Sequence, residues 1–253
     1  MIQTFNMEEL LAYFYVFTRL GGVMMLLPGF GEFYIPMRIR LLTAVVMSLA
    51  ITPVVAGTLP ATTLVGAETV YFLAREIAIG FALGAIGRIL LNALQISANL
   101  IAYQTSLSSA TIFNPAMGTQ DSPFAPYLIM GATALIFVTN THYQIIDVFI
   151  KSYDAFPPTG GFPFGDFKDM MVRIVSHSFS LGVRLAFPFL IAGLIVNFSG
   201  GLLGRLVPQI QVFFVLMPAQ VLLGLICVMI CVTTIMSVFV QDFFNLYQDL
   251  PRG

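Results

Sequence analysis

The side chains that could do chemistry in this sequence are charged groups embedded in strongly apolar stretches. They are Arg19, Arg75, Arg88, Arg184, Glu76 and Asp147. An arginine that faces lipid costs about 2.5 kcal/mol or more, so each needs a partner, an aqueous path or a helix end from which it reaches the interface. A proton relay would place acidic groups deep in several helices, and Glu76 and Asp147 are too few for one. Two interpretations of the arginines stay open: ion pairs within a helix bundle, and positions near helix ends from which the side chains reach the membrane interface.

The sequence lacks the residue constellations of known catalytic sites. An intramembrane protease would need a GxSxG-type serine or paired aspartates in apolar runs, and neither occurs. The serines near residue 106 have no nearby base, and the histidines and cysteines do not have the spacing of metal ligands. Those four residues are His142, His177, Cys227 and Cys231. We therefore predict a protein that is not an enzyme and holds no cofactor.

The segment "GRLVPQIQVFFVLMPAQ", residues 204–220, interrupts two apolar runs with polar and helix-breaking residues. These are Arg205, Pro208, Gln209, Gln211 and Pro218. Each proline removes a backbone donor and clashes with a carbonyl four residues earlier, so we expect Pro208 to separate the two runs and Pro218 to break the start of the second. The freed carbonyls then need partners in protein or water. The segment reads as the tip of a helical hairpin buried against other subunits.

The composition excludes a soluble globular domain. The 253 residues are 58% hydrophobic and 9% charged, whereas soluble domains carry about 25% charged residues. The chain is therefore predicted to be a multi-pass membrane protein. Its net charge of -1 gives no basic footprint for nucleic acid. The acidic start "MIQTFNMEEL" does not resemble a cleaved signal peptide, so the first apolar run is expected to stay in the protein.

The elements that carry these residues are predicted to be helices, because long apolar runs without period-2 alternation cross lipid as helices. Six runs stand out, at about residues 10–27, 41–59, 69–104, 127–150, 178–198 and 212–240. The third run lacks proline and would form about 55 Å of helix, which is too long for a bilayer core. Either the helix leaves the membrane or the chain folds back inside a protein shell. Within the third run, Gly80 and Gly84 have the small-xxx-small spacing of a close helix contact. We expect an all-α membrane protein of about six helical segments forming kinked hairpins.

The connections differ in composition. Residues 28–40 and 105–126 are expected to be loops, and residues 151–176, rich in Pro and Gly, are predicted to be the main solvent-exposed loop. The basic residues of the loops divide three against four between the two sides, which gives no orientation under the positive-inside rule.

Four segments resemble, in order, the FliR/SctT family of type III secretion export-gate proteins. They are "YIPMRIRLLTA" (34–44), "SLSSATIFNPAMG" (106–118), "NTHYQII" (140–146) and "GLLGRLVPQIQVFFVLMPAQVLLGL" (201–225). The resemblance covers nearly the full length, and the short chain without a long tail is more similar to the flagellar branch, the flagellar biosynthetic proteins FliR, than to the injectisome branch.

The resemblance implies a subunit of the flagellar type III secretion export gate, part of the channel through which unfolded flagellar proteins leave the cell. It implies a hetero-oligomer with FliP and FliQ, with FlhB at the cytoplasmic base, in the bacterial inner membrane and the flagellum basal body. It also implies one domain, residues 1–253, with a FliP-like part at about 1–175 and a FliQ-like hairpin at about 176–253.

The resemblance further assigns roles to residues. The family's pore plug maps to Ala110, Thr111, Ile112, Phe113, Asn114 and Pro115. From the residues themselves, and not from the resemblance, we expect assembly roles for Arg205, Pro208, Gln209, Gln211, Arg19 and Arg184. For the two arginines Arg19 and Arg184, we expect partner subunits to supply carboxylates or helix C-terminal carbonyls.

Two alternatives are weighed against the flagellar gate. One is an SctT-type injectisome subunit. The other is a small-molecule secondary transporter with broken helices and a midplane site, which usually shows two related halves. The sequence shows no such halves, and this disfavours the transporter.

Overall fold

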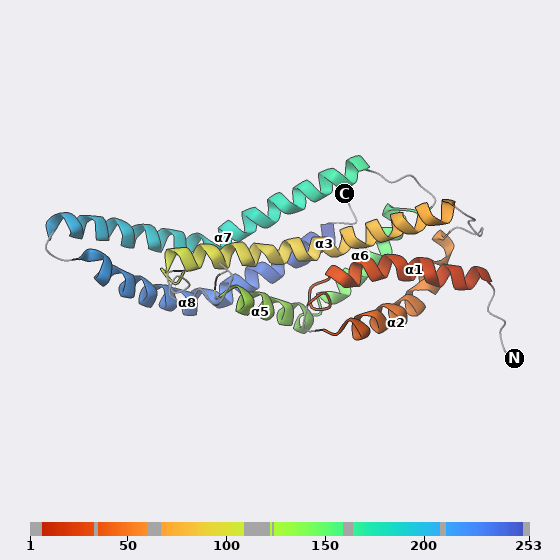
Figure 1. Ribbon diagram of the computed structural model, residues 1–253, viewed down its shortest axis with the longest axis horizontal. Coiled ribbons are helices and arrows are strands. Elements are labelled where there is room, and N and C mark those ends of the chain that lie inside the picture. Colours follow the sequence, from red (N-terminus) through yellow and green to blue (C-terminus); the bar gives the residue numbers. More distant parts are fainter. Residues whose placement is uncertain are drawn as a thin grey trace. The chain divides into compact units, whose positions relative to one another are not determined.

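The computed structural model of the chain describes residues 7–32, 35–59, 67–108, 122, 124–158, 164–207 and 211–249, and helices joined by turns make up this part of the chain (Figure 1). The helices are α1 (Met7–Leu26), α2 (Met37–Val55), the 3₁₀ turn η1 (Ala56–Thr58), α3 (Ala67–Gln104), α5 (Ala125–Val138), α6 (His142–Ala155), α7 (Phe164–Leu206) and α8 (Val212–Asp249). No strand occurs in these ranges. The predicted all-α class is confirmed.

Four of the described helices are long and apolar enough to cross a membrane. They are Met37–Thr58, Glu68–Gln104, Phe167–Leu206 and Phe214–Asp249. The predicted first and fourth runs fall on shorter apolar helices, Leu10–Leu26 and Ala125–Val138. The described residues therefore contain six apolar helical segments, and four of them are long enough to cross a membrane.

The chain divides into two compact units. Unit 1 comprises Met1–Ile89, Ile136–Ile174 and Phe244–Gly253, and unit 2 comprises Leu90–Leu135 and Val175–Phe243. The boundaries fall inside α3, α5, α7 and α8, so these helices contribute to both units.

Unit 1 is built on a close contact between α1 and α3. A Cβ added to Gly22 would lie 2.9 Å from the backbone nitrogen of Phe81, and one added to Gly84 would lie 2.7 Å from the carbonyl oxygen of Val23. A Cβ on Gly80 would meet the carbonyl of Arg19. Glycine is the residue that lets the two backbones approach this far. The predicted small-residue contact at Gly80 and Gly84 is confirmed.

Unit 2 repeats this device between α3 and α7. A Cβ on Gly182 would lie 2.8 Å from the carbonyl oxygen of Ala93, and one on Gly193 would meet the side chain of Gln104. Both contacts join residues 89 positions apart (182 − 93 and 193 − 104), so this part of α7 runs parallel to α3. Helix α8 returns antiparallel to α7, with His177 bonded to Asp242 and Asn197 to Gln220.

The predicted third run is one uninterrupted helix, α3, of 38 residues. At 1.5 Å per residue it is about 57 Å long, as its lack of proline indicated. Its buried side chains continue through both units, with Ile79 and Ile86 in the first and Leu94 and Ala98 in the second.

The predicted fourth run, 127–150, is wrong as a single helix. It is divided between α5 and α6 at Thr139–Thr141, where Asn140 has a φ of 59°. Asparagine tolerates this left-handed conformation better than other residues with a Cβ, so it ends one helix and permits the next to start in a new direction. The ring of His142 stacks on Phe137 across the break, with 5.2 Å between centroids.

Two further expectations are corrected. Residues from Phe164 onward are helical, so the solvent-exposed loop predicted at 151–176 ends much earlier. Ile174 is buried, and apolar residues at helical spacing before it favour a helix over the Pro/Gly signal of the preceding segment.

Pro218 does not break the start of the sixth run, because α8 continues through it, and α7 likewise contains Pro188. Apolar helices accommodate proline where neighbouring groups re-satisfy the freed carbonyl.

The two adjacent glycines of α1 offer a test of the α1–α3 contact. Gly22→Ala should destabilise the protein by about 1–3 kcal/mol, because its methyl group would overlap the backbone of α3. Gly21 has nothing within 4 Å, so Gly21→Ala should be neutral or stabilise α1 by roughly 0.5–1 kcal/mol. The measurement is protease resistance of the full chain in membranes after heating to a series of temperatures. Equal midpoints for the two variants would contradict the close contact.

Candidate functional site

A buried ion pair between α1 and α3 forms the polar centre of unit 1. Arg19 Nε donates to Glu76 Oε2 at 2.6 Å, and Nη2 donates to Oε1 at 3.0 Å. The Arg19 side chain is 0% exposed and that of Glu76 is 1% exposed. Two parallel bonds between a guanidinium and a carboxylate are a strong, orientation-specific pairing. The pair thus neutralises both charges inside an apolar chain.

The remaining donors of Arg19 bind the C-terminal end of α6. Nη1 donates to the carbonyl oxygen and to Oγ of Ser152, each at 3.1 Å, and Nη2 donates to the carbonyl oxygen of Phe156 at 3.0 Å. With the two bonds to Glu76, these contacts match all five guanidinium N–H groups. The cluster joins three helices and leaves no donor on Arg19 for further chemistry.

Tyr153 closes the cluster on its remaining face. Its ring lies 3.9 Å from Arg19 Cζ, a cation–π contact. Burial raises the pKa of the Tyr153 phenol, the nearby Arg19 charge lowers it, and the Glu76 charge raises it. The net effect is upward, so the phenol stays neutral. A fully matched guanidinium beside a neutral phenol has no group poised to transfer a proton.

Arg75 extends the same arrangement along the chain. Its guanidinium donates to the carbonyl oxygens of Pro157, at 2.8 Å, and Pro158, at 2.5 Å. Together with the bond from Arg19 to Phe156, two arginines hold three consecutive backbone carbonyls. The exit from α6 is therefore fixed by charge-assisted bonds.

A third arginine of the sequence pattern is paired near the surface. Arg88 Nη1 lies 2.6 Å from Glu32 Oε1, and Arg40 donates to the Glu32 carbonyl oxygen at 2.9 Å. Arg88 is 45% exposed, so this pair contributes little compared with the buried one. The ion-pair interpretation holds for Arg19 and Arg88, whereas Arg75 uses carbonyls.

Arg19 corrects one expectation. It lies inside the protein, and its carboxylate comes from Glu76 of the same chain rather than from a partner subunit. These partners could not be identified from the sequence, because they lie 57 and 133 positions from Arg19 and share no motif with it. Arg184 is different, since its side chain is exposed on α7. Its place in an assembly stays a prediction.

The residues of the 204–220 segment are only partly described. Arg205 lies exposed in the last turn of α7, and Gln211 lies exposed just before α8. Pro208 and Gln209 lie outside the described residues, as do all six positions assigned to a plug, Ala110–Pro115. The expected interruption between the two runs is confirmed, because α7 ends at Leu206 and α8 begins at Val212.

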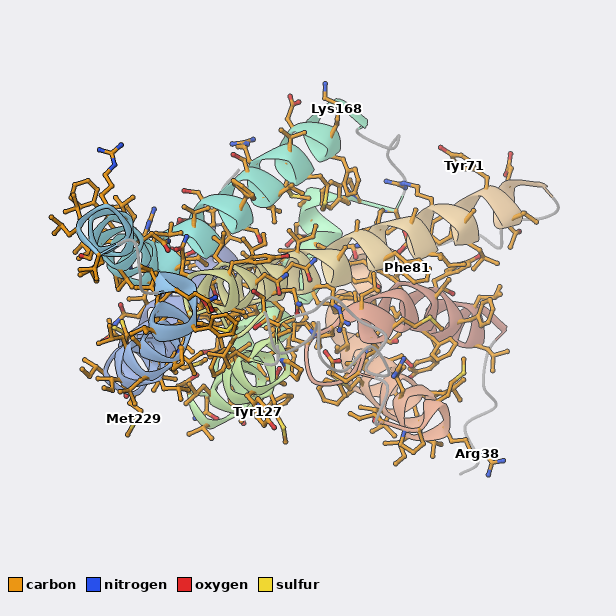
Figure 2. The ribbon with its side chains drawn as sticks, turned by 60° about the vertical axis from the view of Figure 1, so that its left-hand side comes forward. Arg38, Tyr71, Phe81, Tyr127, Lys168 and Met229 are labelled. Carbon is orange, nitrogen blue, oxygen red and sulfur yellow. The ribbon has the colours of Figure 1, made fainter. Side chains whose placement is uncertain are left out.

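The α7–α8 hairpin of unit 2 presents a broad uncovered apolar surface. In the most apolar stretch of α8, 11% of the residues are buried, compared with 33% in that of α7. Met229 is 78% exposed and points outward from α8, as Tyr127 (77%) does from α5 (Figure 2). Within unit 2, the exposed apolar residues of α7 run from Val175 to Leu206. Contiguous exposed surface of this kind marks contact with lipid or protein.

One pair of ionisable side chains lies within the otherwise apolar α7–α8 hairpin. His177 Nε2 lies 2.5 Å from Asp242 Oδ2, joining α7 to α8 at 37% and 19% side-chain exposure. Among the described residues, no group of three His, Cys, Asp or Glu side chains is arranged to hold a metal ion. The described part of the chain thus has two features of interest: buried clusters of polar side chains and an uncovered apolar surface.

The chain is similar in sequence to known bacterial export and flagellar biosynthetic proteins. The model of the bacterial export proteins, family 1, matches residues 10–246. The flagellar biosynthetic protein FliR of Caulobacter vibrioides is 36% identical over 91% of this chain and 92% of its own length. FliR of Aquifex aeolicus is 32% identical over 97% of this chain and 94% of its own length. The Yop proteins translocation protein T of Yersinia pestis is 25% identical over 58% of each chain.

The buried pair yields a quantitative expectation. Glu76→Gln should destabilise the chain by about 3–5 kcal/mol, because it leaves the Arg19 charge buried without a counter-charge. Replacing both partners, Arg19→Met with Glu76→Leu, should recover most of this loss. The measurement is the midpoint of thermal aggregation in detergent together with the half-life of the chain in cells.

Asp147→Asn is the matched control for this experiment. It removes the exposed Lys151 pair on α6 and should cost less than about 1 kcal/mol. A Glu76→Gln protein as stable as the Asp147→Asn protein would show that the buried pair is not a major determinant of stability.

Proposed function

From the premise that this chain belongs to the bacterial export proteins, family 1, we propose that it is a subunit of the flagellar type III secretion export gate. It is a membrane protein and forms part of the channel through which flagellar proteins are exported. The flagellar role is favoured over the injectisome role, because the FliR proteins match more of this chain, at higher identity, than the Yersinia protein does.

The observation that carries this proposal is the length of the uncovered apolar surface on the hairpin. In unit 2, exposed apolar side chains on α7 extend from Val175 to Leu206, about 46 Å of helix at 1.5 Å per residue. A hydrocarbon core is about 30 Å thick, so lipid alone does not cover this length of an upright helix. Other protein subunits supply the rest of the cover.

The partners that we propose are FliP and FliQ in one hetero-oligomeric gate, with FlhB at its cytoplasmic base. The gate sits in the inner membrane within the flagellar basal body, and its substrates are unfolded flagellar proteins. Within this arrangement, residues 1–175 take the FliP-like role and residues 176–253 form the FliQ-like hairpin. Arg184, exposed on α7, faces a partner or the aqueous lumen rather than acyl chains.

Co-expression tests this assignment. The full chain should be degraded or aggregated when it is expressed alone and long-lived when FliP and FliQ are present. Native mass measurement of the affinity-purified complex should then find all three proteins. A lone chain that is monodisperse and long-lived in detergent would contradict the proposal and favour a self-contained transporter.

We also propose that Ala110–Pro115 plug the pore of the closed gate. The motivation is the composition of residues 105–125, which contain one charged residue, Asp121, in a connection that would be more polar if it were solvated. This role rests on the subunit assignment above, and a separate experiment tests it.

Deleting Ala110–Asn114 should leave the complex assembled but make the membrane leak ions and small molecules. The assay is uptake of a membrane-impermeant dye by cells, with complex yield measured in parallel. Unchanged permeability in cells that contain a normal amount of complex would refute the plug.

Arg205 is proposed as an assembly residue. It stands in the last turn of α7, where a cation interacts favourably with the unpaired carbonyls of a helix end. Arg205→Ala should lower recovery of the complex, and Arg205→Lys should be intermediate because the planar fork is lost. Normal complex yield combined with abolished export would instead assign Arg205 to conduction.

A further inference from the structure

Helix α2 of unit 1 has two faces that differ in chemistry. Three of its five buried residues are small or carry a hydroxyl group, and the five are Ala44, Ser48, Ile51, Thr52 and Val55. The hydroxyls of Ser48 and Thr52 donate to carbonyl oxygens of α2 itself. Small side chains let helices approach closely in membranes. This face is therefore occupied by neighbours in the same unit, α1 and α6, and Figure 1 shows α2 beside α1.

The opposite face of α2 is a stripe of large aliphatic side chains. Its members recur three or four residues apart and are each at least half exposed: Ile39, Leu42, Val46 and Leu49. The exposed part of α7 differs, because Ser199, Gly201 and Gly204 lie among its apolar residues. Small residues are typical of helix–helix interfaces in membranes, whereas large aliphatic residues favour contact with acyl chains. The outer face of α2 thus has the composition of a lipid-facing surface.

The length of α2 also matches a bilayer. The helix runs from Met37 to Val55, and its 19 residues span about 28 Å at 1.5 Å per residue. A hydrocarbon core is about 30 Å thick. The uncovered part of α7 exceeds that thickness. Of these two exposed surfaces, the one on α2 is therefore the one that lipid can cover along its whole length.

The start of α2 carries a positive charge that other side chains do not neutralise. Arg38 is exposed there and points away from the helix (Figure 2). It takes part in no ion pair among the described residues, whereas Arg40 donates to the carbonyl oxygen of Glu32 at 2.9 Å. The Glu32 carboxylate is paired with Arg88. Between Glu32 and Glu68 the sequence contains no acidic residue, so this end of the apolar face is cationic.

We propose that the outer face of α2 contacts lipid and that Arg38 binds the headgroup phosphate of an anionic phospholipid. The stripe from Ile39 to Leu49 lies along the acyl chains, and the aliphatic stem of Arg38 lets its guanidinium reach the headgroup region. A guanidinium and a phosphate form paired, charge-assisted hydrogen bonds. An anionic phospholipid thus matches both the charge and the apolar length of this face. The inference does not depend on the flagellar assignment, because any bacterial membrane supplies this ligand.

Cross-linking distinguishes lipid from protein on this face. A benzophenone amino acid is placed at Val46 of α2 or at Leu194 of α7, in the full chain co-expressed with FliP and FliQ, and is activated in membranes. Val46 should form adducts with phospholipid and none with protein, whereas Leu194 should form protein adducts. A protein adduct at Val46 would overturn the lipid assignment. A lack of protein adducts at Leu194 would count against the proposed gate assembly and leave the assignment of α2 intact.

Binding of the headgroup is measured separately. The full chain, purified in detergent with the partners that accompany it, is titrated with phosphatidylglycerol or phosphatidylcholine, and bound lipids are counted by native mass measurement. The parent should prefer phosphatidylglycerol, and Arg38→Gln should lower this preference about fivefold, which is the effect of one basic residue near an anionic surface. Arg38→Lys should retain most of the preference because the charge stays.

Lys168→Gln is the matched control for the lipid titration. It removes an exposed charge that already lies 3.5 Å from a carboxylate oxygen of Asp169, so the preference for phosphatidylglycerol should match that of the parent. An unchanged preference in Arg38→Gln, or an equal loss in Lys168→Gln, would overturn the headgroup site.

Discussion

The structure of unit 1 depends on the neutralisation of Arg19 inside an apolar chain. An unpaired buried guanidinium would cost several kcal/mol, which is a large part of the stability of a typical domain. Glu76 supplies the counter-charge, and carbonyl or hydroxyl groups of α6 bind the other N–H groups. Because each partner lies on a different helix, the charge can be buried only when α1, α3 and α6 are all in place. The ion pair is thus a condition for one arrangement of three helices rather than a simple source of stability.

The two units solve different problems with similar means. Glycines bring α3 close to α1 in one and to α7 in the other, so that polar side chains can reach across short gaps. In unit 1 those side chains enclose a charge. In unit 2 they form isolated bonds, Ser106 to Gln220 and His177 to Asp242, within a surface that stays apolar and uncovered. A chain with this division has a fixed interior and an exterior that other molecules complete.

The sequence predicted features that depend on local patterns. The absence of proline indicated the length of the apolar run that forms α3, the glycine spacing predicted its close neighbour, and Pro208 predicted the interruption between α7 and α8. Prediction from the sequence failed where a single residue ends a helix or where two distant residues form a contact. Asn140 splits a run that hydropathy alone joins, and Pro/Gly-rich composition concealed the start of α7. Ser152, Gln220 and Asp242 could not be identified as partners because their contacts join positions 65 to 133 residues apart.

The distance along the chain between Arg19 and its partners also has a consequence in time. Glu76 is made 57 residues after Arg19, and Ser152 is made 133 residues after it. At about 5–20 residues per second, roughly 3–11 s pass before the counter-charge exists, and the last ligands follow later still. During synthesis α1 therefore carries an unneutralised cation, and it stays a poor candidate for release into lipid until α3 has emerged. The order of translation makes the first helix the one whose final placement waits for the others.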